Sequence, residues 1–328
     1  GVIDYVIASK DKSVYLLDQN GFKGSADLET FLLGTPTVGN IDDDDELELI
    51  VGGYSSSGEK IYALNHDLTP VNGFPVDIDE KIKMGVSLAD FNGNGREDIV
   101  FGTNDDNIYL LLDDGTIAEG FPFQTGNKIH SSPAILDLDG ELVILAGSND
   151  DFLYAINSDG SLRFSVQASD AVEGSPSFLN FMNQCYIFFG DKSGMVYGID
   201  TEGNMLPNFP FDGGSQIIGS IVFSDLNSDT FPEIIFGTDS GEMYVINLDG
   251  ELYPQMPISF PFPFYSSPMI SDIDEDGDME IIAGTSLSIN AYDIKQPGTN
   301  DGYWSMYKRN SKRTGVHQFS PPCAMGDI

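Results

Sequence analysis

Short apolar runs, most of which end at glycine, recur along this chain at a nearly constant spacing. Each run follows an anchor position, and the anchors are residues 4, 48, 98, 141, 185, 233 and 280. The runs occupy residues 5–8, 49–52, 99–102, 142–147, 186–190, 234–237 and 281–284. Because they are short and show no apolar spacing of three and four, they predict β-strands rather than the helices of a solenoid.

Each apolar run is followed by a second strand-like segment that carries a tyrosine. These tyrosines are Tyr15, Tyr62, Tyr109, Tyr154, Tyr197, Tyr244 and Tyr292. Several lead into an acid–glycine pair, such as Asp114–Gly115, which suits a tight hairpin. A Phe-Pro segment follows, and the next unit often opens with a small residue and proline, as at Ser132–Pro133. Each unit therefore predicts four short antiparallel strands.

A period in the mid-forties with four strands per unit is typical of a β-propeller blade. We therefore predict an all-β, seven-bladed β-propeller of four-stranded antiparallel blades, in a single domain over residues 1–320. The predicted blades span approximately residues 1–34, 35–85, 86–131, 132–175, 176–220, 221–267 and 268–313. Residues 321–328 then form a tail.

The first unit lacks an opening strand, because its anchor is already Asp4. Residues 302–310 and 314–320 are long enough for two further strands. We expect the later strand to pair with blade one and to close the ring. The alternative is an extended tail on the surface.

Four acidic stretches precede the apolar runs and share one spacing. They begin at Asn40, Asp90, Asp225 and Asp272, and each places oxygen-bearing side chains at positions 1, 3, 5 and 9. Calcium binds six to eight such hard oxygens, and the backbone carbonyl of position 7 would add another. An EF-hand is excluded because position 12 is apolar in every copy, for example Val51.

The predicted metal-binding residues are the odd positions of these four loops. They are Asn40, Asp42, Asp44, Glu46, Glu48, Asp90, Asn92, Asn94, Arg96, Asp98, Asp225, Asn227, Asp229, Phe231, Glu233, Asp272, Asp274, Asp276, Asp278 and Glu280. Solvated acidic turns are the alternative, but carboxylates confined to one loop repel each other without a cation. We predict about four structural calcium ions. Residues 137–141 and 180–185 have lost most of the pattern, so we expect blades four and five to be metal-free.

Charge and composition limit the partners. The 52 acidic and 15 basic residues give a net charge of −37, which disfavours nucleic acid and anionic membranes. No run of 18 apolar residues is present, so we expect no direct membrane insertion. Cys185 and Cys323 are too few for a disulfide framework, and we expect two unpaired thiols.

These loops resemble FG-GAP and VCBS repeats, in which Asp-x-Asp/Asn-x-Asp-Gly-x-x-Asp precedes an apolar strand and glycine. The likeness covers residues 1–320 and is strongest at 90–102 and 272–284. It implies a propeller similar to the integrin α-subunit head, with calcium loops on the face opposite the ligand. The tyrosine strands also look similar to quinoprotein repeats, but those enzymes use recurrent tryptophans, and Trp304 is the only tryptophan here.

The C-terminal part carries two further resemblances. Residues 304–315 are similar to a closing segment of secreted bacterial propellers, and residues 325–328 look like the start of a dockerin-like calcium module. The resemblance implies a secreted bacterial protein that works outside the cell or at its surface, in adhesion or another interaction.

The candidate ligand-binding residues lie in loops that the blade pattern places on the face opposite the calcium loops. They are Tyr54, Lys83, Asn104, Asp106, His130, Asn149, Lys192 and Tyr265. Aromatic, amide and charged groups of this kind can stack on and hydrogen-bond a glycan or a surface protein. The alternative is that they are ordinary solvated loop tips.

Catalytic chemistry has little support in the sequence. The three histidines, His66, His130 and His317, fall in different units, and no nucleophile motif accompanies them. We therefore predict a non-catalytic binding or interaction module. The alternative is a polysaccharide-processing enzyme, a lyase or hydrolase, with a site assembled across blades. Nothing in the sequence requires a particular oligomeric state.

Overall fold

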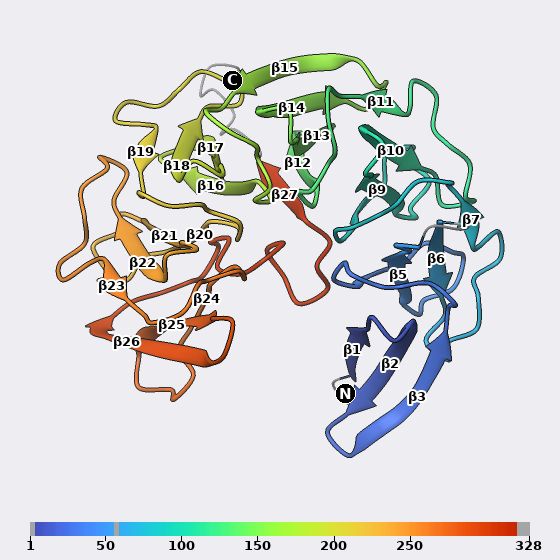
Figure 1. The fold of residues 1–328 in the computed structure, drawn as a ribbon, viewed down its shortest axis with the longest axis horizontal. Coiled ribbons are helices and arrows are strands. Elements are labelled where there is room, and N and C mark those ends of the chain that lie inside the picture. The colour runs from blue at the N-terminus through green and yellow to red at the C-terminus, as the bar shows by residue number, and fades with distance from the viewer. Residues whose placement is uncertain (1–3, 56–58, 320–328) are drawn as a thin grey trace, which may run out of the picture.

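The computed structural model describes residues 4–55 and 59–319. Within these ranges the chain contains β-strands and turns, and no α-helix. The strands form seven sheets, six of which are built from consecutive antiparallel strands alone. Figure 1 shows the sheets arranged around a common centre, in which the last strand, β27 (Val316–Phe319), lies. The predicted tail at 321–328, including Cys323, lies outside the described residues.

The strands of the first four sheets are as follows. The first sheet contains β1 (Asp4–Ala8), β2 (Ser13–Asp18) and β3 (Gly21–Asp27). The second contains β4 (Thr37–Gly39), β5 (Glu48–Gly52), β6 (Lys60–Leu64) and β7 (Val76–Asp77). The third contains β8 (Ser87–Ala89), β9 (Asp98–Gly102), β10 (Asn107–Leu111) and β11 (Phe123–Gln124). The fourth contains β12 (Ala134–Leu138), β13 (Glu141–Gly147), β14 (Phe152–Asn157) and β15 (Leu162–Gln167), with β27 added.

The remaining sheets follow the same order. The fifth contains β16 (Ser177–Phe181), β17 (Gln184–Gly190), β18 (Met195–Ile199) and β19 (Phe211–Asp212). The sixth contains β20 (Val222–Ser224), β21 (Glu233–Gly237), β22 (Glu242–Ile246) and β23 (Ile258–Ser259). The seventh contains β24 (Met269–Ser271), β25 (Asp278–Gly284) and β26 (Ile289–Pro297).

The recurrent glycines at strand ends are explained by packing between neighbouring segments. A Cβ atom on Gly102, at the end of β9, would lie 2.1 Å from Cγ2 of Ile129. The same substitution at Gly52, at the end of β5, would place the Cβ 2.3 Å from Cγ2 of Ile82. Ile82 and Ile129 lie in the crossings that lead to the next sheet, and both are buried. Glycine is therefore required for these crossings to pack against the strand.

Several of the recurrent tyrosines stack on aromatic partners across the strand pair. Tyr109 of β10 lies opposite Phe101 of β9, with ring centroids 5.2 Å apart and an interplanar angle of 5°. Equivalent stacked pairs join Phe189 to Tyr197 at 4.8 Å and Phe236 to Tyr244 at 5.1 Å. Such pairs contribute about 0.5–1.5 kcal/mol beyond their burial. In the third, fifth and sixth sheets the tyrosine thus helps to hold the second and third strands in register, whereas Tyr15, Tyr62, Tyr154 and Tyr292 lie opposite aliphatic residues.

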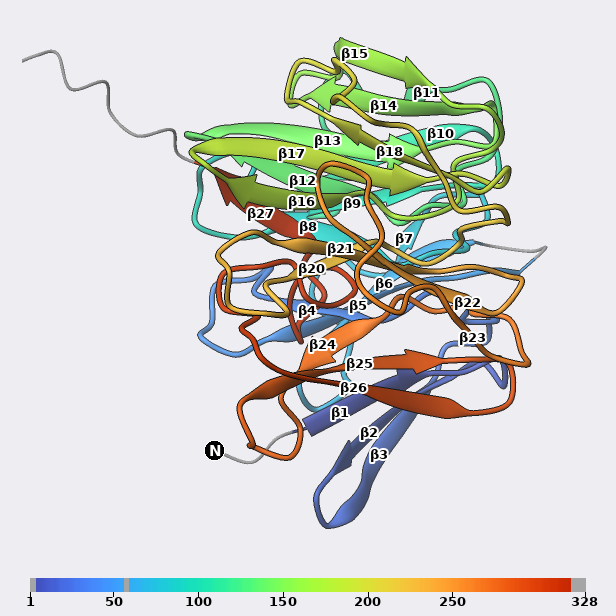
Figure 2. The same cartoon turned by 90° about the vertical axis from the view of Figure 1, so that its left-hand side faces the viewer.

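The C-terminal segment, residues 299–319, occupies the centre of the molecule and is called here the axial segment. Its carbonyl oxygens accept backbone N–H groups from the inner strands of five sheets. The bonds are Phe223 to Trp304 (3.0 Å), Ile270 to Ser305 (2.8 Å), Val38 to Lys312 (2.9 Å), Leu88 to Thr314 (3.0 Å) and Ile135 to Gly315 (2.8 Å). Figure 2 shows β27 at the end of this segment, beside β12, as Figure 1 does.

The predicted closure through blade one is wrong for the described residues. β27 runs parallel to β12 of the fourth sheet, with Ile135 opposite Val316, and the segment before it forms turns rather than a further strand. The physical reason is burial: Trp304 and His317 are each 1% exposed, and their rings pack against Phe178 with centroids 5.3 and 5.5 Å away. These contacts hold the segment at the centre rather than at the first sheet or on the surface.

The first sheet keeps an open inner edge among the described residues. β1 pairs with β2 on one side only. Tyr5 and Ile7 of β1 are 56% and 51% exposed, whereas all residues of the corresponding strand β9 are buried. The first and seventh sheets therefore have three strands each, one fewer than the predicted four.

Replacing the central tryptophan should destabilise the fold strongly. Trp304→Ala removes a large, fully buried side chain, which costs about 3–5 kcal/mol in the free energy of unfolding. Leu287→Ala is the control, because Leu287 is 73% exposed and its loss should change this free energy by about 0.5 kcal/mol or less. Denaturant unfolding followed by circular dichroism measures both, since Trp304→Ala removes the one tryptophan fluorophore. Equal stability of the two variants would contradict a structural role for the axial segment.

Candidate functional site

The four acidic loops share one internal contact, made by the acid that closes each loop. One oxygen of this carboxylate accepts the backbone N–H of loop position 2. The pairs are Ile41 and Glu48 (2.9 Å), Phe91 and Asp98 (2.8 Å), Leu226 and Glu233 (2.7 Å), and Ile273 and Glu280 (2.7 Å). This bond turns the loop over the start of the following strand, and so brings positions 1 to 5 over the closing acid.

The loop at Asp272 gathers the largest group of carboxylates. One oxygen from each of Asp274, Asp276, Asp278 and Glu280 lies within 4.8 Å of the others. Oδ1 of Asp272, Oδ1 of Asp278 and Oε1 of Glu280 are buried and have no hydrogen-bond partner. Because buried polar atoms are almost always paired, this donor set fits a hard cation. The side chain of Asp278 joins the group, whereas the sequence predicted only its backbone carbonyl.

The loop at Asn40 has the same character. Oxygens of Asp42, Asp44 and Glu48 lie within 4.8 Å of one another. Oδ1 of Asn40 and Oε1 of Glu48 are buried without a hydrogen-bond partner. The carboxylate of Glu46 lies apart from this group and contacts Nδ1 of His66. Three of the four predicted side chains thus gather at one position, and the fourth, Asn40, has an unpaired buried oxygen, whereas Glu46 was predicted to offer only its backbone carbonyl.

The loop at Asp90 is closed by its own hydrogen bonds. The carboxylate of Asp90 accepts the backbone N–H groups of Gly93 and Gly95, each at 2.7 Å. Nδ2 of Asn94 donates to Oδ1 of Asp113 at 3.0 Å, in the hairpin that follows β10. Arg96 pairs with Asp113 and, across to the neighbouring loop, with Asp43, each at 2.5 Å. The acidic loop at Asp90 and the acid–glycine hairpin after β10 thus lie on one face.

The loop at Asp225 is similar to the loop at Asp90. Its Asp225 carboxylate accepts the N–H groups of Asp229 at 3.2 Å and Thr230 at 2.9 Å. Nδ2 of Asn227 donates to Oδ2 of Asp229 at 3.0 Å. The side chain of Phe231 is half exposed and packs on Phe181, so only its backbone could serve a metal.

Burial raises the pKa of the closing acids. The pKa of Glu48 and of Glu233 rises to about 7, and that of Asp98 to about 6, chiefly because these carboxylates are removed from water. The pKa of Asp278 rises to about 6, first through its hydrogen bond with Asp276. Negative charge in these loops is therefore costly unless a cation offsets it.

In the fourth and fifth sheets a short hairpin turn takes the place of the acidic loop. Leu138 pairs directly with Glu141, and Phe181 with Gln184. The central residues all have positive φ, at 57° and 93° for Asp139 and Gly140, and 48° and 61° for Met182 and Asn183. These are the angles of a type I′ turn, which needs no metal to close.

A second cluster of polar side chains lies in the loops at the other ends of the strands, and we call it the His130 cluster. Nε2 of His130 lies 3.0 Å from Oδ1 of Asn104, and its Nδ1 lies 3.1 Å from Nζ of Lys83 and 3.3 Å from Oε1 of Glu173. The other members are Tyr54, Asn149 and Lys192. The loops of four neighbouring sheets, the second to the fifth, thus contribute to one network.

The remaining contacts of the cluster converge on Glu173. Its Oε1 accepts a hydrogen bond from Nδ2 of Asn149 at 3.2 Å, and Nζ of Lys192 lies 3.8 Å away. The hydrogen bond from His130, with the nearby charges of Lys192 and Lys83, lowers the pKa of Glu173 to about 2. Glu173 is therefore an anion held among three basic groups.

Sequence reasoning selected six members of this cluster and missed Glu173. The register of the repeats is the feature of the sequence that could have identified Glu173. His130 stands two residues before Ser132–Pro133, and Glu173 stands two residues before the equivalent Ser175–Pro176. The same position, just before the third and seventh units open, holds Lys83 and Tyr265. These side chains belong to one ring of equivalent positions.

A pocket of about 350 Å³ lies beside the cluster at the axis of the molecule, and we call it the axial pocket. It is lined by the hydroxyl groups of Thr35, Ser175, Ser220, Ser266, Ser267 and Tyr307, with Met84, Ile218, Gly219, Tyr265 and Arg313. Tyr265, one of the predicted ligand residues, is 56% exposed here. Asp106 lies elsewhere, in a turn whose backbone carbonyl accepts Thr125, and it is not a member of the cluster.

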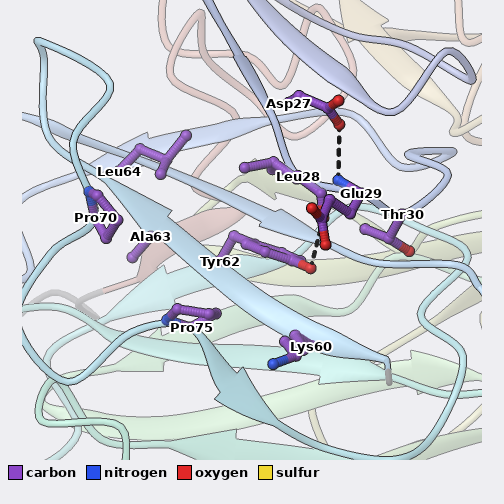
Figure 3. Close-up of a pocket in the computed structure, with 10 residues that line it drawn as sticks. All are labelled: Asp27, Leu28, Glu29, Thr30, Lys60, Tyr62, Ala63, Leu64, Pro70 and Pro75. Carbon is purple, nitrogen blue, oxygen red and sulfur yellow. Dashed lines mark hydrogen bonds between the residues drawn. The ribbon is translucent and has the colours of Figure 1, made fainter. Parts of the chain in front are cut away.

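A pocket of about 460 Å³ lies between the first two sheets and is drawn in Figure 3. The hydroxyl of Tyr62 crosses it and donates to the carbonyl of Leu28 at 2.9 Å. Lys60, which also lines it, pairs with Asp77 at 3.0 Å. The pocket contains none of the predicted ligand residues, and its interactions join the two sheets.

Comparisons with known proteins bear on the fold alone. No protein-family model and no curated protein matches the chain. No helix of the described chain is long and apolar enough to cross a membrane.

Solved structures match the chain over most of its length at low sequence identity. BBS1N, in its complex with ARL6DN, is 16% identical over 89% of this chain and 90% of that chain, with a TM-score of 0.59. BamB from Moraxella catarrhalis is 14% identical over 89% and 95%, with a TM-score of 0.52. The V. cholerae biofilm matrix protein Bap1 is 19% identical over 74% and 42%, with a TM-score of 0.57. Together with the antiparallel sheets around one centre, these matches support a β-propeller fold.

Proposed function

We propose that this protein is a non-catalytic binding module that acts outside the cell or at its surface, with a glycan or a surface protein as its ligand. The observation that carries the proposal is the His130 cluster. It draws Lys83, Asn104, His130, Asn149 and Glu173 from separate loops into one hydrogen-bonded network beside a pocket. Polar side chains that contact only water gain little stability from being brought together in this way. A ligand-binding site, in contrast, needs several fixed polar groups in one place.

We also propose a specific architecture and a structural metal for this protein. The seven sheets are the blades of a seven-bladed propeller of the FG-GAP or VCBS kind, and the acidic loops are structural calcium sites. Support for calcium comes from the five unpaired buried oxygens of the loops at Asn40 and Asp272. Asn40, Asp42, Asp44 and Glu48 would hold one ion, and Asp272, Asp274, Asp276, Asp278 and Glu280 another. Bound calcium would neutralise the loop carboxylates and so stabilise these hairpins.

A polysaccharide-processing enzyme is the second candidate, and one contact favours it. Nδ1 of His130 lies 3.1 Å from Nζ of Lys83 and 3.3 Å from Glu173, so a titratable base stands beside two charged groups. The imidazole is 14% exposed and its second nitrogen is held by Asn104. With both nitrogens engaged, His130 is better placed to hold the loops than to move a proton, which leaves binding as the preferred function.

Chelation should lower the thermal stability of the protein, and calcium should restore it. Glu280→Gln should reduce the number of bound calcium ions by about one, because it removes a charged ligand from the densest loop. Glu141→Gln is the matched control, since Glu141 holds the equivalent position in the fourth sheet and pairs with Arg163 instead. Calorimetric titration and melting curves measure both. An unchanged melting temperature in strong chelator would contradict structural calcium.

Without calcium, stability should fall as the pH rises from about 5 to about 8. Glu48, Glu233 and Asp98 have raised pKa values, so the folded state holds protons that the unfolded chain has released from groups of ordinary pKa. The stability that these protons confer is present at low pH and is lost as the pH passes through about 6 to 7. Calcium should remove the decline. Melting temperatures with and without chelator test this, and a flat or rising curve in chelator would count against it.

Disrupting the His130 cluster should weaken binding of the protein to its ligand without unfolding the protein. Lys83→Ala removes a donor from the network and should reduce binding about tenfold or more, if the lysine makes a charge-assisted bond to the ligand. Arg163→Ala, which changes the charge equally on the face of the metal loops, is the control.

Affinity electrophoresis against a panel of acidic and neutral polysaccharides, and pull-down with intact bacterial surface protein, give the readout. If Lys83→Ala and Arg163→Ala are retained equally, the proposal that the ligand binds at the His130 cluster is contradicted. Release of reducing ends or unsaturated sugars from any of these polysaccharides would contradict a non-catalytic module and indicate a polysaccharide-processing enzyme.

A further inference from the structure

The axis of this acidic protein carries positive charge with no acidic partner. The net charge of the chain is −37, yet Arg309 and Arg313 lie in the axial segment, beside Lys308, whose pKa burial lowers well below its ordinary value. Within the described residues no carboxylate forms an ion pair with any of the three. They donate to carbonyl and hydroxyl oxygens instead, as Lys308 does to Ser87 at 2.8 Å and Arg309 to Val316 at 3.0 Å.

Arg313 brings this charge to the axial pocket. One nitrogen of its guanidinium donates to the carbonyl of Tyr307 at 2.6 Å, which fixes the side chain at the pocket wall. The guanidinium has further N–H donors in a planar fork, and it stays protonated at any working pH. Burial lowers the pKa of Arg313, and the nearby hydroxyl of Tyr307 acts in the opposite direction without reversing this effect. A bound anion would therefore offset the unfavourable free energy of burying the charged guanidinium of Arg313.

Several of the residues that line the pocket carry hydroxyl groups, and they come from more than one sheet. The hydroxyl of Ser266 is already bonded to the backbone of Gly284. Oγ of Ser175 accepts the N–H of Ser132 at 3.0 Å, and Oγ of Ser267 accepts the N–H of Ser220 at 2.8 Å. These bonds fix the oxygen positions, and the Ser267 hydroxyl keeps its own proton to donate. The half-exposed ring of Tyr265 stands at the rim. An anchor for an anion, fixed hydroxyls and an aromatic ring thus share one cavity.

We propose that the axial pocket binds a carboxylate-bearing sugar ring of an acidic glycan. Arg313 receives the sugar carboxylate in a bidentate contact, the serine and threonine hydroxyls bond the hydroxyls of the sugar, and Tyr265 covers its apolar face. An acidic peptide would meet the guanidinium but would leave the hydroxyl wall unmatched. The inference rests on the proposed function, because it names the ligand class for the same face.

The experiment compares glucuronate with glucose, two sugars that differ in the carboxylate. Binding to the calcium-loaded protein at about 0.15 M salt, where long-range repulsion by the acidic surface is screened, is followed by ligand-observed NMR. We expect glucuronate to bind about tenfold or more tightly than glucose, and Arg313→Gln to abolish this preference. Arg163→Gln, with the same change of charge on the opposite face, should keep it.

Further variants and probes separate the possible results. Tyr265→Ala, which changes an exposed side chain and leaves the fold intact, should weaken glucuronate binding without changing the preference for the carboxylate. Equal affinity for glucuronate and glucose would overturn the proposal even if Arg313→Gln does not fold. Binding of inorganic phosphate or of a glutamate-rich peptide as tightly as glucuronate would overturn the assignment to a sugar.

Failure of this inference can be told from failure of the proposed function. Suppose that Lys83→Ala weakens polysaccharide retention but the protein binds glucuronate no more tightly than glucose. The proposed binding face is then supported, and the assignment of the axial pocket to an acidic sugar is contradicted. If neither variant affects retention and no probe binds, both fall.

Discussion

The backbone hydrogen bonds between the axial segment and the inner strands are the interaction on which the rest of the structure depends. The short inner strands, such as Ser87–Ala89 and Val222–Ser224, would otherwise turn unpaired N–H groups toward the centre. Unpaired buried groups of this kind are costly. By accepting Leu88, Phe223 and Ile135, one stretch of chain ties together sheets that are far apart in the sequence. It also places Tyr307 and Arg313 at the floor of the axial pocket.

This arrangement divides the molecule into two faces with different chemistry. On one face, closing acids such as Glu280 turn the acidic loops back on their strands, and unpaired buried oxygens remain for a cation. On the other, the crossings between sheets bring His130, Glu173 and Lys83 together around the axis. Glycines such as Gly102 permit the second arrangement, because the crossing can pack directly on the strand only where no Cβ intervenes. The proposed calcium sites and the proposed binding face are thus opposite ends of the same strands.

Charge would make the proposed binding face selective among ligands. The chain as a whole repels anions, since 52 acidic residues outnumber 15 basic ones. The basic residues of the axial segment nevertheless lie where no described carboxylate pairs with them. A ligand that carries negative charge would therefore meet unpaired basic groups at the axis, which is a more selective arrangement than a uniformly basic surface.

Much of this structure was determined by local sequence. Apolar runs that end at glycine became β5, β9 and β21, because a strand buried on both faces needs such residues and the glycine needs its packed crossing. The loop pattern at Asp272 gathered its carboxylates, since the spacing lies within one hairpin. What only the tertiary structure decided was long-range. β27 joined the fourth sheet rather than the first, and Glu173 joined His130. Strand pairing and side-chain convergence depend on which distant surfaces bury Trp304 and the axial segment, and no local pattern encodes that choice.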